Sequence, residues 1–283
     1  MNVLSLFDGM SCGQIALDNL GIKVDNYFAS EIKKHAIQCT LDNFPNTKHI
    51  GDVTKVKGSD LPEIDLLIGG SPCQDFSRAN SVRDGLKGTK SMLFYEYIRL
   101  LEETKPKYFL LENVIMDDIG YSTISELLGT EPVRLNGARV SAALRDRLFW
   151  TNIGPESFDL FGNRKCAIPQ PIDKKIMLQD VLDYGYTNKK KHTCLTLNCT
   201  SVRKKESMIH RLKTTGMTTI IYEDDTFDLD KDIRYVNQNE LEKLHNIPKG
   251  YTRNMTHRQA NDLIGDGWTV GIVEHIFSFM TER

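Results

Sequence analysis

The sequence predicts an α/β protein with a mixed, mostly parallel sheet and a smaller, less regular second region. In the first half of the chain, short apolar runs alternate with amphipathic stretches, which is the pattern of βαβ units. After Asn152, glycines and prolines interrupt this alternation, and a boundary is expected between residues 154 and 172. The content of hydrophobic (40%) and charged (26%) residues excludes disorder as the main state.

Apolar periodicity predicts the individual elements. The expected strands are Val3–Phe7, Val24–Ala29, Asp65–Ile68, Tyr108–Leu111 and Leu148–Ile153. The expected helices are Gly13–Leu20, Ile32–Asn43, Met92–Glu103 and Val270–Phe279. No stretch approaches the roughly 20 apolar residues that cross a bilayer, and the chain reaches Asp8 too early for a secretory signal. An intracellular protein is therefore expected.

Charge is distributed unevenly along the chain. The 36 basic and 38 acidic residues leave a net charge of −2, which excludes attraction to nucleic acid through bulk positive charge. Residues 186–216 form a basic segment, whereas residues 222–232 are acidic and are expected to be a solvated turn or loop. The basic segment is either solvated surface or a surface that contacts phosphates. Its candidate DNA-binding residues are Lys189, Lys190, Lys191, Arg203, Lys204 and Lys205.

A glycine-containing loop follows the first predicted strand and opens the first predicted helix. It reads Phe7-Asp8-Gly9-Met10-Ser11-Cys12-Gly13, and its glycines allow a tight turn and a close approach of the backbone to a ligand. The loop has neither the Gly-Lys-Ser/Thr of a nucleotide phosphate loop nor the three-glycine dinucleotide fingerprint. It predicts a ligand-binding site that does not specifically call for a pyrophosphate.

Two acids follow this loop where neighbouring strands of such a sheet would end. Glu31 comes just after the second predicted strand, where an acid accepts hydrogen bonds from a ribose diol. Asp52 is expected to accept a hydrogen bond from an adenine amino group at the next strand end. Either acid alone is as readily a surface residue, but the three features in this order indicate an adenosine-containing cofactor across the carboxyl ends of the sheet.

Cys73 is the candidate nucleophile. It follows Gly69, Gly70 and Pro72 on the loop after a predicted strand, where a thiolate can be exposed and activated. The alternative is a buried structural thiol, which is the usual fate of a cysteine. The six cysteines of the chain lack the regular spacing of a small disulfide scaffold, so reduced thiols are expected.

Glu112 is the candidate acid, because it ends an apolar run that should lie in the core. Desolvation disfavours the charged form of a carboxyl, so Glu112 is expected to be able to donate a proton. A helix cap or a buried ion pair is the alternative role. Arg145 and Arg147 stand on alternate positions just before another predicted strand, so both guanidiniums are expected to point into the same cleft.

Taken together, these motifs resemble the cytosine-C5 DNA methyltransferase family. Asp8-Gly9 with Gly13, Pro72-Cys73-Gln74, Glu112-Asn113-Val114 and Arg145-Asp146-Arg147 occur in the family's order. The resemblance implies a DNA (cytosine-5-)-methyltransferase that transfers a methyl group from S-adenosylmethionine to C5 of a flipped cytosine in duplex DNA. It also implies a covalent cysteine adduct, S-adenosylhomocysteine as the product, and a Rossmann-like methyltransferase fold with a seven-stranded sheet.

The resemblance also implies a role for each motif. Cys73 corresponds to the nucleophile, Glu112 to the acid and Arg147 to an arginine that steadies the cytosine, and Arg145 is grouped with these catalytic residues. The cofactor-binding residues that it implies are Phe7, Asp8, Gly9, Met10, Ser11, Cys12, Gly13, Glu31, Ile32, Asp52, Val53, Gly70, Pro72, Leu93, Trp268 and Val270.

The C-terminal part of the sequence is similar to the animal de novo DNA methyltransferases. Residues 265–270, which include Trp268, occupy the place of the family's last motif, and Ala143 stands where most bacterial relatives have a glutamine. Trp268 is alternatively a core residue that packs the terminal helix onto the sheet. The resemblance implies a catalytic and cofactor-binding domain at 1–160, a target-recognition region at 161–254 and a segment at 255–283 that returns to the catalytic domain.

Other functions explain parts of the pattern. A tRNA cytosine-C5 methyltransferase shares the motifs, although the Cys-Phe-Thr hallmark of that branch is missing from residues 161–254. A non-catalytic DNA-binding regulatory homologue is a further alternative, and intact Cys73 and Glu112 argue against it. A nicotinamide oxidoreductase would leave the Pro-Cys loop unexplained. A zinc site at His192, Cys194 and Cys199 has no evident fourth ligand, so no metal is expected.

Duplex DNA is the expected partner, and no membrane association is expected. The expected location is the cytoplasm of a bacterial or phage-infected cell, or the nucleus if the source is eukaryotic. Restriction-modification, phage self-protection and a solitary epigenetic role all fit the sequence. The recognised DNA sequence and the oligomeric state stay open, and a monomer is one option.

Overall fold

The computed structural model describes residues 1–71, 92–160, 162–195, 204–215 and 218–280. The chain divides into two compact units. Unit 1 contains residues 1–135, 146–170 and 273–283, and unit 2 contains residues 136–145 and 171–272. The functional roles expected for residues 1–160, 161–254 and 255–283 stay predictions. In the part of the chain that the structure describes, no helix has the length and apolar character needed to span a membrane.

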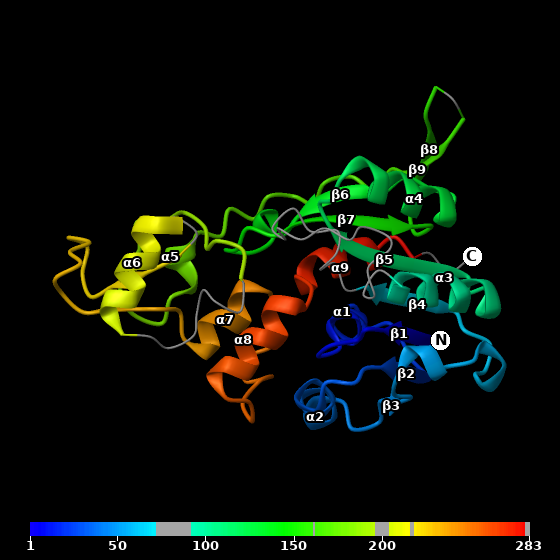
Figure 1. Cartoon of the computed structure of the whole chain (residues 1–283), viewed down its shortest axis with the longest axis horizontal. Helices are drawn as coiled ribbons and strands as arrows, with labels where there is room; N and C mark the ends of the chain where they lie inside the picture. Colours follow the sequence, from blue (N-terminus) through cyan, green and yellow to red (C-terminus); the bar gives the residue numbers. More distant parts are fainter. Residues whose placement is uncertain (72–91, 161, 196–203, 216–217, 281–283) are drawn as a thin grey trace. The chain divides into compact units, whose positions relative to one another are not determined.

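Within the described residues, seven strands form one mixed sheet in the order β3-β2-β1-β4-β5-β7-β6 (Figure 1). The strands β1 to β5 pair in parallel, whereas β7 runs antiparallel to β5. This arrangement confirms the predicted mixed, mostly parallel seven-stranded sheet. The strands are β1 (Asn2–Leu6), β2 (Asn26–Ser30), β3 (Lys48–His49), β4 (Leu66–Gly70), β5 (Tyr108–Val114), β6 (Val133–Asn136) and β7 (Asp146–Thr151).

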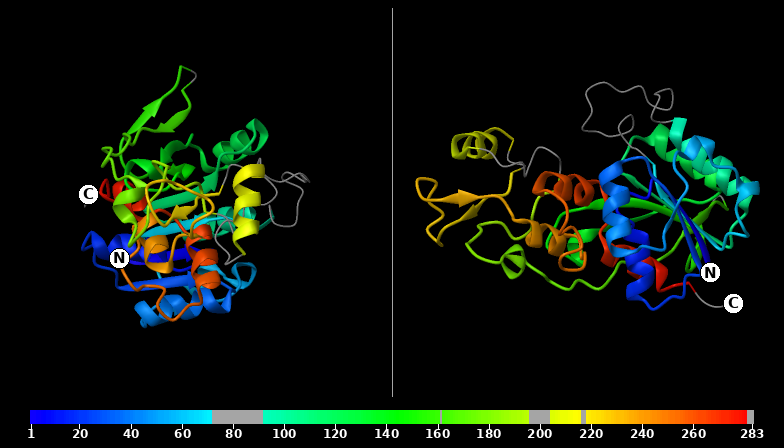
Figure 2. Two further views of the ribbon diagram at one scale, coloured as in Figure 1. Left: turned by 90° about the vertical axis from the view of Figure 1, so that its left-hand side faces the viewer. Right: turned by 90° about the horizontal axis from the view of Figure 1, so that it is seen from below.

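Helices cover both faces of this sheet (Figure 2). On one face, α3 and α4 pack against alternate strand residues such as Leu67 and Leu111 in one buried cluster. On the other face lies α1, and the amide of Asn19 in α1 donates a 2.6 Å hydrogen bond to Glu274 of α9. The helices are α1 (Cys12–Asn19), α2 (Lys34–Asn43), α3 (Met92–Thr104), α4 (Asp118–Leu128) and α9 (Val270–Phe277), with short 3₁₀ turns at Val53–Lys55, Gly58–Asp60 and Gly137–Arg139.

The predicted strands and helices of the first half are confirmed, with ends that shift by a few residues. The structure adds β3, β6 and α4, which the sequence did not predict. The two-residue β3 is too short for an alternating pattern to register. The sequence does contain residues typical of helix ends at α4. Asp117 caps its first turn, and Gly129 ends the helix in the left-handed conformation.

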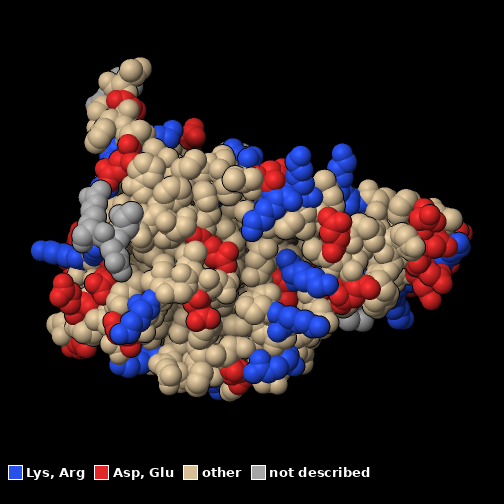
Figure 3. Space-filling model, turned by 180° about the vertical axis from the view of Figure 1, so that it is seen from behind, with Lys and Arg blue, Asp and Glu red and all other residues tan. Residues whose placement is uncertain are grey.

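Outside the large sheet the structure is less regular. Unit 1 also contains the antiparallel pair β8 (Glu156–Phe158) and β9 (Arg164–Cys166). Unit 2 has a small core that includes Met208, Ile220, Tyr222 and Tyr235. The acidic residues 223–232 form the exposed turn of the β10–β11 hairpin, where Asp and Glu side chains gather (Figure 3), as predicted. The elements of unit 2 are α5 (Leu178–Val181), α6 (Lys205–Thr215), β10 (Ile221–Tyr222), β11 (Ile233–Arg234), α7 (Gln238–Leu244) and α8 (His257–Asp266).

Candidate active site

The loop between β1 and α1 has an unusual backbone. Phe7 (φ 56°) and Ser11 (φ 60°) occupy the left-handed region, as does Gly9 (φ 59°). A non-glycine residue in this region costs roughly 1 to 3 kcal/mol, and such strain clusters at functional sites. A Cβ atom placed on Gly9 would meet no described atom within 4 Å. The loop is therefore held in a strained turn whose Gly9 faces open space, where a ligand can approach the backbone.

The side chains of this loop turn mostly toward the protein. Met10, Ser11 and Cys12 are buried. Phe7 is partly buried and packs against the core. The carboxylate of Asp8 accepts a 2.9 Å hydrogen bond from the Tyr27 hydroxyl and another from the Ser11 hydroxyl. Asp8 thus directs its carboxylate to protein hydroxyls.

The structure brings Glu31 to the same loop. Its Oε2 accepts a 2.8 Å hydrogen bond from the main-chain N–H of Gly9. Its Oε1 accepts from the N–H groups of Ile32 (2.7 Å) and Lys33 (2.8 Å). Ile32 itself is 72% exposed. The glycine loop and the first of the two predicted acids therefore form one cluster at the carboxyl ends of β1 and β2.

Asp52 follows the end of the next strand, β3, which agrees with the predicted order of the two acids. Its Oδ1 accepts hydrogen bonds from the main-chain N–H (3.0 Å) and the hydroxyl (2.9 Å) of Thr54, and these bonds hold the pKa of Asp52 below its ordinary value. The hydroxyl of Ser30 in β2 donates to the carbonyl of Gly51 (2.7 Å), which fixes this segment beside the end of β2. Val53 is buried, and Leu93 packs against the same core.

The two neighbouring strands β4 and β5 end side by side. Gly70 pairs with Glu112 in the parallel register, and the side-chain amide of Asn113 donates a 3.1 Å hydrogen bond to the hydroxyl of Ser71. Ser71, which directly precedes the Pro72-Cys73 motif in the sequence, therefore lies beside the strand that carries Glu112. Pro72 and Cys73 themselves lie outside the described residues.

Glu112 forms an ion pair with Arg147. The Nε atom of Arg147 lies 2.9 Å from Oε1 of Glu112, and the side chains are 15% and 10% exposed, respectively. The pair is possible because β7 runs antiparallel to β5 and sets Arg147 opposite Val114, two residues from Glu112 along the strand. An ion pair was one of the alternatives for Glu112, and it joins two of the predicted catalytic residues.

Arg145 has different partners. It is 5% exposed, belongs to unit 2, and donates hydrogen bonds to the main-chain oxygens of Gly265 (2.8 Å) and Asp266 (3.4 Å). The shared cleft expected for Arg145 and Arg147 assumed that both stand in the strand, but β7 begins only at Asp146. The structure gives the two arginines separate partners, and the catalytic role of Arg145 stays a prediction.

Trp268 and Val270 also belong to unit 2. Trp268 is partly buried in the segment that follows the two carbonyl acceptors of Arg145. Val270 is fully buried, and its N–H donates to the carbonyl of His245 (2.9 Å). Contact of either residue with a cofactor stays a prediction.

Several lysines of the basic segment bind the protein's own backbone. The ammonium of Lys191 donates to three main-chain oxygens at 2.6 to 2.8 Å, those of Ala138, Ser141 and Ile176. Burial lowers the pKa of Lys191, and the charges of two nearby aspartates oppose this effect. An ammonium held in this way serves the fold and is a poor candidate for a phosphate contact.

Lys189 donates to the main-chain oxygen of Thr218 (2.7 Å), and Lys205 donates to those of Asp230 and Lys231 (2.7 Å each). Lys190 and Lys204 are exposed. Arg203 lies outside the described residues. The basic segment therefore contains two kinds of lysine, which the sequence alone does not distinguish. In the described part of the chain, no group of three or more His, Cys, Asp or Glu side chains is placed to hold a metal ion.

The sequence analysis did not predict the buried polar residues beneath the loop between β1 and α1. Ser5, Tyr27 and Thr40 are buried around Asp8 and Ser11, and the hydroxyls of Ser11 and Thr40 lie 3.0 Å apart. A signal was available, because Ser5 is the one hydroxyl residue inside the apolar run Val3–Phe7. A polar side chain in a strand covered on both faces needs a buried partner.

Comparison with known proteins gives a consistent result for the N-terminal part. Residues 1–116 match the family model of the C-5 cytosine-specific DNA methylases. The orphan methyltransferase M.Rho11sI of Bacillus phage rho11s is 44% identical over 116 residues, which cover 40% of this chain and 23% of that protein. The type II methyltransferase M1.ScrFI of Lactococcus lactis subsp. cremoris is 34% identical over 180 residues, which cover 58% of this chain and 45% of that protein.

The matched stretches thus span less than half the length of these two relatives. Among solved structures, the Dnmt2 methyltransferase of S. pombe has a TM-score of 0.72 at 18% identity and is similar over 98% of this chain and 97% of that one. At this low identity the likeness establishes the fold. Together with the observed sheet order, it confirms the predicted Rossmann-like methyltransferase fold.

Proposed function

We propose that this chain, whose first 116 residues match the model of the C-5 cytosine-specific DNA methylases, transfers a methyl group from S-adenosylmethionine to C5 of cytosine in duplex DNA. The observation that carries the proposal is the meeting of two strand ends. Gly70, three residues before Cys73 in the sequence, pairs with Glu112, whose carboxyl group is buried. A candidate nucleophile and a candidate acid then serve the same edge of the sheet as the cofactor loop.

The residues at this edge suit S-adenosylmethionine. The backbone is open at Gly9, and Glu31 and Asp52 follow at the ends of successive strands. These carboxylates can accept hydrogen bonds from a ribose and an adenine, as acids at such strand ends do. When bound, the cofactor supplies an electrophilic methyl group on a sulfonium ion. The residues of this chain must then make C5 of cytosine nucleophilic.

Cys73 and Glu112 supply that activation in our proposal. The thiolate of Cys73 adds to C6 of the cytosine, while Glu112, which must take up a proton and leave its ion pair with Arg147 for this step, donates a hydrogen bond or a proton to N3. The C5–C6 double bond is thereby opened, and C5 becomes nucleophilic enough to take up a methyl group. Loss of the proton from C5 and departure of the thiolate then restore the ring. Arg147, which pairs with Glu112, is suited to steady the base.

The cytosine must leave the double helix for this reaction. Within a duplex, stacked neighbours shield C6 from an attacking thiolate, and extruding a base costs a few kcal/mol. We therefore expect the enzyme to flip its target base. A flipped base also explains why a buried acid at a strand end is useful, since N3 becomes accessible only outside the base pair.

The test is methyl transfer with Cys73→Ala, compared with Cys194→Ala as a matched control, because Cys194 is partly exposed and lies in unit 2. We expect the wild type and Cys194→Ala to incorporate labelled methyl groups into duplex DNA as 5-methylcytosine, and Cys73→Ala to incorporate none. Full activity of Cys73→Ala would refute the covalent step. Transfer to tRNA instead of DNA would refute the proposed substrate.

Covalent trapping provides a second test. Duplex DNA containing 5-fluorocytosine cannot lose a proton from C5 after methylation, so the adduct with the enzyme should persist. Mass spectrometry of the trapped complex should locate the DNA on residue 73. Attachment at any other residue would move the nucleophile elsewhere.

A further inference from the structure

The carboxylate of Asp8 is the central acceptor of a buried hydroxyl cluster. It accepts hydrogen bonds from the hydroxyls of Tyr27 (2.9 Å) and Ser11, and Ser5 also hydrogen-bonds to it. The Ser11 hydroxyl lies 3.0 Å from that of Thr40. Through these contacts one carboxylate connects the loop to β1, β2 and α2.

The cluster lies under the most strained part of the loop. Phe7 and Ser11, which flank the turn, are both non-glycine residues with positive φ. Such conformations persist only where surrounding contacts enforce them. Ser11 is fully buried, and its hydroxyl bond to Asp8 closes the turn from within. The carboxylate is therefore placed to stabilise the left-handed conformation of Ser11.

The outer side of the loop is bound to the end of β2. The main-chain N–H of Asp8 donates to the carbonyl of Ser30 (3.2 Å), and that of Gly9 donates to Glu31 (2.8 Å). The position of the Glu31 carboxylate thus depends on the shape of the turn. A change in the hydrogen bonds around Asp8 would therefore shift the main chain of Gly9 and the carboxylate of Glu31, the two groups that we assign to cofactor binding.

We propose that Asp8 is a positioning residue, which in its ionised form holds the turn at residues 7–11 in the shape that binds the cofactor and does not itself touch the cofactor. This inference rests on the proposed function, because it concerns the S-adenosylmethionine site. An ionised carboxylate only accepts hydrogen bonds, so it suits three hydroxyl donors. A protonated carboxyl would present a donor to that same cluster and break at least one of these bonds.

Titration of Asp8 falls in an accessible range. Burial raises the pKa of Asp8 to about 6, an effect that the hydrogen bonds from Ser11, Ser5 and Tyr27 oppose and the charge of Glu31 reinforces. Burial lowers the pKa of His49, and the charge of Glu31 opposes this effect. Cofactor affinity should therefore fall as the pH decreases through about 6.

Stability should respond in the opposite direction. The pKa of Asp8 in the folded protein exceeds its ordinary value of 3.8, so the folded state binds the proton more tightly than the unfolded chain does. The resulting contribution to stability is complete below pH 3.8 and is lost as the pH rises through about 6. Protonation of Asp8 would thus stabilise the fold while it weakens cofactor binding, a combination that a purely structural residue would not produce.

The experiment measures the dissociation constant of S-adenosylhomocysteine by calorimetry between about pH 5.5 and pH 8, a range that lies above the ordinary pKa of Asp and Glu side chains. We expect the wild type to lose about three- to fourfold in affinity by pH 5.5, because a carboxyl group with a pKa of about 6 is then roughly three-quarters protonated. Asp8→Asn should bind weakly throughout with little pH dependence. Tyr27→Phe should bind less tightly and shift its midpoint upward, because one hydroxyl donor is lost. Asp18→Asn, at an exposed position of α1, is the matched control and should behave as the wild type.

The outcomes separate this inference from the proposed function. If the wild type does not bind S-adenosylhomocysteine at any pH, the proposed cofactor is wrong. If the wild type binds and Asp8→Asn binds equally well with the same pH dependence, Asp8 is not the positioning residue. Unfolding of both proteins across the same pH range provides the folding control. The wild type should lose more stability than Asp8→Asn as the pH rises through about 6, and equal losses would contradict the inference.

Discussion

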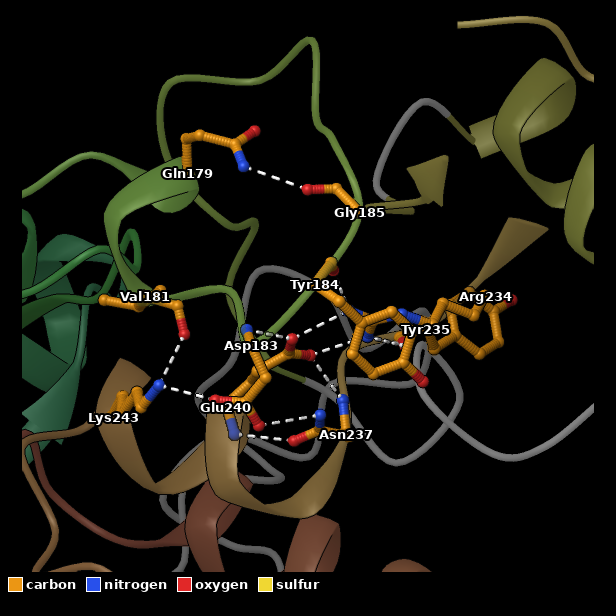
Figure 4. A network of polar contacts seen from close by, with 10 residues as sticks. All are labelled: Gln179, Val181, Asp183, Tyr184, Gly185, Arg234, Tyr235, Asn237, Glu240 and Lys243. Carbon is orange, nitrogen blue, oxygen red and sulfur yellow. Dashed lines mark hydrogen bonds and ion pairs between the residues drawn. The ribbon is translucent and has the colours of Figure 1, made fainter. Parts of the chain in front are cut away.

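Each compact unit contains a buried glutamate paired with an arginine, but the two glutamates have different surroundings. In unit 2, Glu240 is fully buried, and its carboxylate accepts four hydrogen bonds (Figure 4). Two come from the guanidinium of Arg234 (2.7 and 2.8 Å), and two come from the main-chain N–H groups of Asp183 (2.8 Å) and Asn237 (2.7 Å). A carboxylate offers about four acceptor sites, so the protein itself satisfies Glu240 completely.

In unit 1, Glu112 lies near the end of β5, opposite Gly70 of β4, and its side chain keeps 10% exposure. The Nε atom of Arg147 lies 2.9 Å from the Oε1 atom of Glu112. Arg234, by contrast, donates hydrogen bonds to Glu240 from two nitrogens. Its guanidinium carbon lies 3.8 Å from the ring centre of Tyr184. The comparison teaches that a glutamate–arginine pair does not have one fixed role. The surroundings of Glu240 show a structural role, whereas the position of Glu112 supports the catalytic role that we propose for it.

The largest effect should come from Glu112→Gln. This change removes the group that donates to N3 in our proposal, and we expect methyl transfer to slow by roughly 10² to 10⁴-fold, the usual contribution of general acid–base catalysis. Single-turnover transfer to duplex DNA measures the loss. A variant with near-normal turnover would show that Glu112, like Glu240, is a structural residue.

Glu240→Gln should instead reduce stability. Gln places an NH₂ group among four donors and leaves Arg234 without its counter-charge, and breaking a buried pair in this way costs about 3 to 5 kcal/mol. Denaturant unfolding measures the free energy, with Glu112→Gln as the matched variant. We expect the Glu240 variant to lose the more stability of the two. The reverse order would remove the distinction drawn between the pairs.

The sequence predicted the fold of unit 1 well because its signals are local. Buried parallel strands appear as short apolar runs, and the loops that follow them carry the polar residues of a site. Parallel strand ends meet at one sheet edge, so the glycine loop and Glu31 could be expected to meet. The bond from the Gly9 N–H to Glu31 shows that they do.

The contacts that were not predicted depend on register and on distant segments. The ion pair between Glu112 and Arg147 requires β7 to run antiparallel to β5. No local sequence pattern predicts this strand direction. Lys191 reaches the carbonyl of Ala138, 53 residues earlier in the chain. Charge composition alone therefore assigned one role to a group of lysines that the structure divides into two.

That division can be tested at adjacent residues. Lys191→Met keeps the aliphatic stem but deprives three main-chain oxygens of their donor, and leaving such groups unsatisfied should cost about 1 to 3 kcal/mol. Lys190→Met, at an exposed position, should leave the free energy of unfolding unchanged. Chemical denaturation of both variants measures the difference. Equal stability would mean that the Lys191 contacts contribute little.

The smallest effect should come from the exposed lysines, and it should appear in DNA binding. Lys190 and Lys204 are exposed, and the structure shows no hydrogen bond from either ammonium to a described residue. If they contact phosphates, replacing both with Ala should weaken duplex binding several-fold and reduce the salt slope by about one for each lost contact. The measurement is the dissociation constant from fluorescence anisotropy as a function of salt concentration.

Lys189→Ala serves as the control for this last test, because its ammonium is bound to the carbonyl of Thr218. It should leave the salt slope of DNA binding unchanged. A salt slope that falls with Lys189→Ala and stays constant in the double variant would reverse the assignment. Such a result would mean that the backbone-bound lysine exchanges its carbonyl for phosphate when DNA binds. The division between structural and catalytic roles that we propose for the two glutamates would then not extend to the lysines.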